Sequence, residues 1–260
     1  MAVTRRTLLT AVPLAGLFSD VRLRASPPSA IPASFPSHDP DLVKETVVAA
    51  HGNLPRLREL VEARPALAKA TWDWGYGDWE TALGGASHTG SREIAELLIR
   101  NGAAPTIFSA AMLGQLDVVR ALVTKAPGIQ RMRGPHGITL LAHAKAGGPA
   151  AAETATYLES LGDADPRYPV EPLGEGDERA VIGAYAFSTA STDRLIVAAG
   201  ARGLSIKRDG AIERNLFHLG GRVFHPAGAE AVRIRFESGA QPASYLVVED
   251  GPFVVKATRV

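Results

Sequence analysis

Between residues 41 and 165, apolar side chains recur three or four positions apart, which is the period of an amphipathic helix. Three runs of this kind follow closely on a glycine: Leu54, Leu57, Leu60 and Val61; Ile94, Leu97 and Leu98; Val118, Val119, Leu122 and Val123. A glycine can end a helix at positive φ without a Cβ clash. The pattern therefore predicts pairs of short helices joined by tight turns.

Four segments of this region align on one glycine and carry a small residue three positions before it. The glycines are Gly52, Gly90, Gly114 and Gly147, and the small residues are Ala49, Ser87, Ala111 and Ala144. A small residue allows two helices to pack closely, so we expect about four related units.

The second unit carries a resemblance to a known family. Its opening, Thr81 to Ala86, and its close, Asn101-Gly102-Ala103-Ala104-Pro105, resemble the ankyrin repeat, although Ala82 and Gly84 stand where that family has proline and histidine. The resemblance implies an all-α ankyrin-repeat solenoid of about four degenerate repeats over residues 41–165. It also implies that this region binds a protein or peptide.

The glycine-to-glycine spacings depart from the ankyrin period of about 33 residues. The spacing of 24 between Gly90 and Gly114 predicts a lost turn, and the spacing of 38 between Gly52 and Gly90 predicts an enlarged finger. That finger is rich in aromatic and acidic residues, which suit a recognition patch. The candidate partner-binding residues are Trp72, Asp73, Trp74, Tyr76, Asp78 and Trp79. The alternative is that the tryptophans fill space between degenerate repeats.

A stretch rich in proline and glycine, residues 166–179, predicts a linker, and beyond it the apolar period changes from 3.6 to 2. Eight short alternating runs with turn signals between them predict a small antiparallel all-β barrel or curved sheet over residues 180–260. The order of these runs is similar to the lipocalin-like domain appended to bacterial periplasmic serine hydrolases. That resemblance implies an accessory domain without catalytic residues.

The N-terminus has the features of an export signal. Arg5 and Arg6 are followed by a short uncharged apolar run from Leu8 to Phe18, which resembles a bacterial Tat signal. We expect a signal peptide over residues 1–30, a proline-rich linker over residues 31–40, and a periplasmic or secreted protein. The run is shorter than the ~20 residues of a membrane-spanning helix, so we expect no membrane span in the mature chain.

The composition of the chain excludes several kinds of partner and site. The 28 Lys and Arg residues nearly balance the 27 Asp and Glu residues, so no nucleic-acid partner is expected. The chain has no cysteine, which excludes disulfides and thiolate metal sites. No nucleophile elbow, phosphate loop or His-Glu-x-x-His zinc motif is present in the sequence.

The histidines offer only weak signals for a metal site. His218 and His225 lie on neighbouring predicted strands near Glu213, but two histidines without a clear third ligand are weak evidence. His136 and His143 are expected to hydrogen-bond backbone groups. We therefore expect no metal, no cofactor and no catalysis, and interpret the chain as an exported scaffold for an unidentified protein or peptide. The alternative is a small-ligand binder or enzyme with its site in the β-domain or the interdomain cleft.

Overall fold

The computed structural model describes residues 34–188, 193–200 and 203–260. Its contacts divide the chain after Ser37 into an N-terminal unit, Met1–Ser37, and a second unit, His38–Val260. All elements described below belong to the second unit. The predicted signal peptide lies outside the described residues, and its role stays a prediction.

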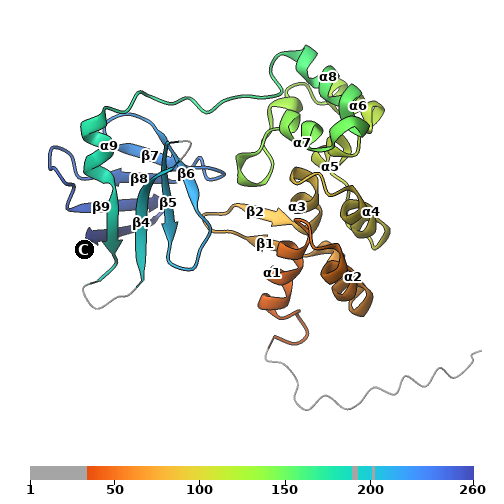
Figure 1. The fold of residues 1–260 in the computed structure, drawn as a ribbon, viewed down its shortest axis with the longest axis horizontal. Helices are drawn as coiled ribbons and strands as arrows, with labels where there is room; N and C mark the ends of the chain where they lie inside the picture. Colours follow the sequence, from red (N-terminus) through yellow and green to blue (C-terminus); the bar gives the residue numbers. More distant parts are fainter. Residues whose placement is uncertain (1–33, 189–192, 201–202) are drawn as a thin grey trace, which may run out of the picture. The chain divides into compact units, whose positions relative to one another are not determined.

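The first half of this unit consists of paired short helices (Figure 1). They flank the four aligned glycines: α1 (Pro40–Ala49) with α2 (Leu54–Ala63), α3 (Ala82–His88) with α4 (Arg92–Arg100), α5 (Ile107–Met112) with α6 (Leu116–Lys125), and α7 (Leu140–Ala146) with α8 (Ala152–Leu161). Threonine caps begin three of them, because Thr81, Thr106 and Thr139 accept a hydrogen bond from a backbone N–H of the first turn. None of the described helices is long and apolar enough to cross a bilayer.

The expected all-α ankyrin-repeat solenoid is wrong. The described residues hold nine α-helices of six to ten residues, and a β-hairpin, β1 (Thr71–Asp73) with β2 (Trp79–Thr81), interrupts them. Four 3₁₀-helices add further breaks: η1 (Pro65–Lys69), η2 (Ile129–Arg131), η3 (Pro135–Gly137) and η4 (Gly148–Ala151). The apolar core of the helical part is also divided into two clusters, whereas a repeat stack buries one continuous core.

The second half is a closed antiparallel barrel of eight strands, so the barrel half of the predicted fold agrees with the structure. The strands are β3 (Gly183–Ala186), β4 (Arg194–Gly200), β5 (Gly203–Arg208), β6 (Arg214–His218), β7 (Val223–Pro226), β8 (Arg233–Phe236), β9 (Tyr245–Asp250) and β10 (Phe253–Arg259). Each strand pairs with the next, and β10 closes on β3. A short helix, α9 (Glu175–Val181), precedes β3 and begins inside the predicted linker.

Large side chains fill the barrel interior, among them Tyr185, Phe224 and Phe236, whose rings pack edge to face. The hairpin β1–β2 extends from the helices toward this barrel (Figure 1). Tyr76, at its tip, packs against the barrel core. The predicted finger is therefore real, but it packs against the chain's own barrel.

Candidate metal centre

The site begins with a buried carboxylate on the hairpin. Successive side chains of a strand point to opposite faces, and in β2 the outer residues Trp79 and Thr81 are exposed while Glu80 is fully buried. An ionised carboxylate taken out of water requires compensating charge and hydrogen bonds. The surroundings of Glu80 supply both.

Three histidines from three other segments surround Glu80. His51 follows the end of α1, and His88 is the last residue of α3, which packs against α1. His136 lies in η3, where its φ of 60° turns the chain sharply. The helix packing therefore brings together residues that are 37 to 85 positions apart in the sequence.

The nitrogen and oxygen atoms of this cluster converge on one point. Nε2 of His88 lies 2.9 Å from Oε1 of Glu80, and Nε2 of His51 and of His136 lie 3.3 and 3.4 Å from Oε2. The two Nε2 atoms of His51 and His88 are 3.1 Å apart. One ligand atom from each of the four residues lies within 4.8 Å of the others.

Several of these separations are close to those in a tetrahedral zinc site. Ligand atoms about 2.0–2.1 Å from zinc in tetrahedral geometry lie about 3.3–3.4 Å from one another. The four distances given above run from 2.9 to 3.4 Å, and the ligand atoms of all four residues lie within 4.8 Å of one another.

The far sides of two rings are held in the manner of metal-ligating histidines. Nδ1 of His51 donates to the carbonyl oxygen of Val47 over 2.9 Å, and Nδ1 of His136 donates to Oδ2 of Asp78 over 2.8 Å. When each ring is neutral, its Nε2 therefore carries a lone pair directed at the cluster. A carbonyl or carboxylate in this position fixes the tautomer of a histidine ligand.

Two further features hold the cluster in place. The indole Nε1 of Trp74 donates to Oε2 of Glu80 over 2.7 Å. Gly85 of α3 leaves room for the ring of His51, because a Cβ at this position would lie 2.8 Å from its Cε1 atom. A larger residue at position 85 would push the ring out of the cluster.

In the metal-free cluster, the carboxylates and the histidines shift one another's pKa values. Burial alone would raise the pKa of Glu80, but the three histidines hold that pKa far below its usual range. Burial would lower the pKa of His136, but its hydrogen bonds to Asp78 and Glu80 outweigh burial and raise the pKa to about 9. The hydrogen bond to Glu80 raises the pKa of His51 as well. Without a metal, protons on the histidines must balance the buried carboxylates.

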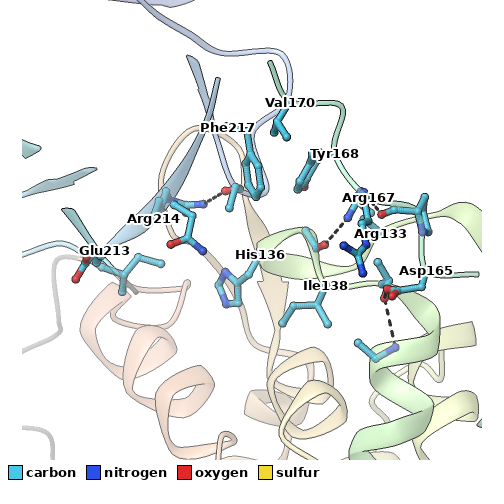
Figure 2. Close-up of a pocket in the computed structure, with 18 residues that line it drawn as sticks. Arg133, His136, Ile138, Asp165, Arg167, Tyr168, Val170, Glu213, Arg214 and Phe217 are labelled. Atoms are coloured by element: carbon cyan, nitrogen blue, oxygen red, sulfur yellow. Dashed lines mark hydrogen bonds between the residues drawn. The ribbon is translucent and has the colours of Figure 1, made fainter. Parts of the chain in front are cut away.

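His136 also borders a cavity of about 900 Å³ between the helical part and the barrel. Figure 2 shows Tyr168 beside Phe217, and Arg133 near Asp165. The guanidinium of Arg133 stacks on the ring of Tyr168 at 3.7 Å and donates to backbone carbonyls. Among the described residues, His136 is the only member of the cluster that borders this cavity.

The predicted partner-binding residues have different environments. Trp72, Asp73, Trp74 and Tyr76 are half-buried, Asp78 is buried, and Trp79 is 62% exposed. Asp78 and Trp74 hydrogen-bond to members of the histidine–glutamate cluster, and sequence reasoning missed these contacts. The prediction that these residues bind a partner stays a prediction.

The other predicted histidine contacts can also be located. Nδ1 of His143 donates to the carbonyl oxygen of Thr139, which is the expected backbone contact, whereas His136 joins the cluster instead. In the barrel, His225 pairs with Phe217 and His218 with Phe224. His218 and His225 therefore point to opposite faces, and the structure does not bring them together as a metal site.

No family model matches this chain, and no curated protein matches it in sequence. The resemblances to the ankyrin family and to the lipocalin-like domain are thus not tested by these comparisons. Function has to be argued from the geometry of the cluster.

Proposed function

We propose that this protein binds a divalent transition metal, with zinc the best match, through His51, Glu80, His88 and His136. The observation that carries the proposal is the convergence of three histidines on one buried carboxylate: each Nε2 lies 2.9 to 3.4 Å from an oxygen of Glu80, and one ligand atom of each residue lies within 4.8 Å of the others. Three imidazoles and one carboxylate suit zinc, whereas magnesium and calcium prefer an all-oxygen shell.

The number of ligands favours a structural role for the metal. A structural zinc has four protein ligands, while a catalytic zinc keeps one position open for water or substrate. Here four side chains converge, and their ligand atoms come from α1's end, α3, β2 and η3. A metal bound by all four would cross-link these segments and anchor the hairpin to the helices.

The experiment is a titration of the chelator-treated protein with Zn²⁺ and with Co²⁺. Zinc binding is measured by calorimetry, and cobalt is followed by its visible spectrum, which is intense for tetrahedral coordination. We expect one metal per chain. His88→Ala and Glu80→Gln each remove one ligand and should lower the zinc affinity by about a hundredfold or more. Loss of a residue that only hydrogen-bonds to a metal ligand costs about 10–100-fold, and loss of the ligand itself should cost at least as much.

The matched control is His218→Ala, which removes a histidine of the barrel outside the cluster. Its metal affinity should equal that of the unaltered protein. Equal affinity in His88→Ala would contradict the proposal, as would a cobalt spectrum of octahedral type.

Protein or peptide binding is a second candidate, and one observation favours it. Trp79 is 62% exposed on the face of β2 opposite Glu80, and large exposed aromatic side chains often serve as anchors in interfaces. A pull-down from periplasmic extract with Trp79→Ala beside the unaltered protein tests it. Recovery of the same proteins by both would argue against a role for this side chain.

A further inference from the structure

A groove of about 380 Å³ lies beside the hairpin strand β2. Trp79 and Thr81 of β2 line one side, and its other lining residues include Phe108 at the start of α5 and Gly134 and Pro135 of the turn before α7. No residue of β1 lines the groove, so it lies on the side of β2 that faces away from its partner strand. The four ligands of the proposed metal centre do not line it either.

The groove lies where the fold has no further strand to pair with β2. The helices α2 and α3 are joined through the hairpin, whereas residues 101–106 join α4 directly to α5. Among the described residues, β2 therefore pairs with β1 alone. An unpaired strand edge is a template on which another extended chain can add.

The register of the hairpin shows which backbone groups of β2 point toward this open edge. Opposite residues of an antiparallel pair alternate between those that exchange hydrogen bonds and those that do not. The N–H groups of Trp74 and Ala82 both donate across the hairpin, so Glu80, which lies midway between these bonds, also exchanges hydrogen bonds with β1. Its neighbours Trp79 and Thr81 therefore point their N–H and C=O groups away from β1.

Two of these outward groups, the C=O of Trp79 and the N–H of Thr81, have no hydrogen-bond partner in the described part of the chain. The N–H of Trp79 donates to the carbonyl oxygen of Gly77 over 3.0 Å, and the C=O of Thr81 is used at the start of α3. One residue of a strand that runs parallel to β2 satisfies both free groups, because its N–H donates to Trp79 and its C=O accepts from Thr81. In an antiparallel strand, two residues would each lose one of their two hydrogen bonds, because the remaining groups of Trp79 and Thr81 are in use.

The charged side chains of the lining are already engaged. Asp78 accepts from Arg214, Arg133 donates to a backbone carbonyl, and Glu230 accepts from the hydroxyl of Tyr168. These two carboxylates and two guanidiniums balance in charge, which favours an uncharged ligand.

The alternation of side chains along a strand defines what the pairing residue and its neighbours can be. The side chain of the pairing residue shares the face of the buried Glu80, so it has to be small. The flanking side chains share the face of Trp79, which is 62% exposed, and apolar groups there would remove part of its ring from water. The expected ligand is therefore an extended segment in which a small residue lies between two apolar ones.

We propose that an extended, uncharged segment of another protein binds in this groove and adds to β2 as a parallel strand. The proposal names the ligand class for peptide binding at Trp79, the second candidate function, and it rests on that candidate. It does not require a metal in the cluster.

The probe is a library of acetylated, amidated hexapeptides with glycine or alanine at one central position and valine, isoleucine, leucine or threonine on either side of it. Calorimetric titration of the purified protein ranks these peptides by affinity. With the tightest-binding peptide in excess, solvent exchange of the Thr81 amide should slow by about tenfold or more in NMR spectra, because that N–H becomes hydrogen-bonded. The amide of Glu80, which is already paired with β1, is the internal control and should not change.

Two changes separate backbone pairing from side-chain contact. N-methylation of the central residue removes the N–H that donates to Trp79 and should reduce the affinity by about fivefold or more. N-methylation of the next residue, whose N–H points away from β2, should have little effect. Trp79→Ala removes the apolar contact and should reduce the affinity by about tenfold. The matched control is Val254→Ala, since Val254 of β10 is also 62% exposed and lies outside the groove. Neither variant should change the zinc affinity.

The proposal is overturned if no peptide of the library binds, if a bound peptide leaves the exchange of the Thr81 amide unchanged, or if both N-methylated peptides bind equally. Loss of partners by Trp79→Ala in the pull-down, with unchanged exchange at Thr81 when the partner is added, would keep peptide binding at Trp79 and reject strand addition. A Thr81 amide that is already protected in the peptide-free protein would show that another segment or a second copy of the chain covers this edge, and it would also overturn the proposal.

Discussion

Nη1 of Arg214, on barrel strand β6, donates to Oδ2 of Asp78 in the hairpin over 2.8 Å, although the two residues are 136 positions apart in the chain. Both side chains are almost completely buried. The same carboxylate accepts hydrogen bonds from Nδ1 and from the backbone N–H of His136. One side chain of the hairpin thus joins the barrel to a histidine of the proposed metal centre.

Asp78→Asn should weaken both functions of this carboxylate. Asparagine keeps one acceptor oxygen and puts an NH₂ donor in place of the other, so in either orientation this donor faces an N–H of His136, the ring is held less firmly, and zinc affinity should fall by about 10–100-fold. The buried guanidinium of Arg214 also loses its counter-charge, which costs about 3–5 kcal/mol of unfolding free energy. Cobalt titration and urea unfolding measure the two effects.

The control for that variant is Glu249→Gln, which breaks the exposed ion pair with Arg235. Surface pairs contribute about 0–1 kcal/mol, so little change is expected in stability and none in metal affinity. Equal losses of stability and zinc affinity in Asp78→Asn and Glu249→Gln would show that Asp78 contributes no more to either property than an exposed ion pair does.

Gly85→Ala should lower metal affinity without unfolding α3. Alanine is favoured over glycine in a helix by about 1 kcal/mol, but its Cβ would lie 2.8–2.9 Å from two atoms of the His51 ring. The ring has to move, and we expect about a tenfold loss in zinc affinity by calorimetry. Gly52→Ala is the matched control, because a Cβ there meets nothing within 4 Å. Unchanged affinity in Gly85→Ala would contradict the placement of His51 among the ligands.

The stability of the metal-free protein should fall as the pH rises from about 6.5 to 9. His136 has an ordinary pKa of 6.5 in the unfolded chain and about 9 when folded, so its protonation stabilises the fold fully below pH 6.5 and progressively less up to pH 9. The expected loss is on the order of 1–3 kcal/mol in urea unfolding. His143 does not titrate in this window, because burial lowers its pKa to about 4.

His136→Gln should reduce this dependence to the part that His51 contributes, because Glu80 raises the pKa of His51 as well, and excess Zn²⁺ should reverse it. A metal competes with protons for the imidazole nitrogens, so the affinity of the protein for Zn²⁺ rises as the pH rises over the same range. The stability of the zinc-bound protein should rise with it. A metal-free protein whose stability stays constant between pH 6.5 and 9 would mean that His136 is not held protonated by the two carboxylates.

The prediction that the protein is exported can be tested at Arg5 and Arg6. Replacing Arg5 and Arg6 by lysine keeps the charge but removes the pair that the Tat receptor recognises. We expect translocation to the periplasm to stop, which cell fractionation and immunoblotting measure. Unchanged translocation would remove the Tat interpretation, and the unaltered chain in the same strain is the reference.

The strands and helix pairs could be predicted because their causes are local. Alternation of period two marks all eight barrel strands, and the 3.6-residue period with a following glycine marks the helix pairs. The fold class of the first half was wrong because helix periodicity does not show that a β-hairpin interrupts the helices and that their apolar core is divided into two clusters. In the structure, the short runs on either side of Gly75 and Gly77, Thr71–Asp73 and Trp79–Thr81, pair as strands.

The cluster of His51, Glu80, His88 and His136 could not be predicted in the same way, since its side chains come from four separate segments with no fixed spacing. Two signals were present in the sequence. His51 lies just after the first helix of one pair and His88 ends the first helix of the next, and helices that pack side by side bring such ends together. Glu80 lies between two exposed strand residues, so the alternation of β2 points it inward. Neither signal identifies His136, whose position depends on the fold of η3.

Removal of the metal should destabilise the protein by an amount set by the metal concentration. A ligand present at about a hundred times its dissociation constant stabilises the folded state by about 2.7 kcal/mol. For a chain of this size, 1 kcal/mol corresponds to about 2–4 °C, so adding Zn²⁺ to chelator-treated protein should raise Tm by roughly 5–10 °C. The same addition to His88→Ala should leave its Tm unchanged, while His218→Ala should respond as the unaltered protein does.

Limited proteolysis gives a second measurement, because loss of the metal releases the anchor of β2: cleavage near Gly75 and Gly77 should become faster in the metal-free protein. A cleavage rate that is independent of zinc would mean that the metal does not hold the hairpin.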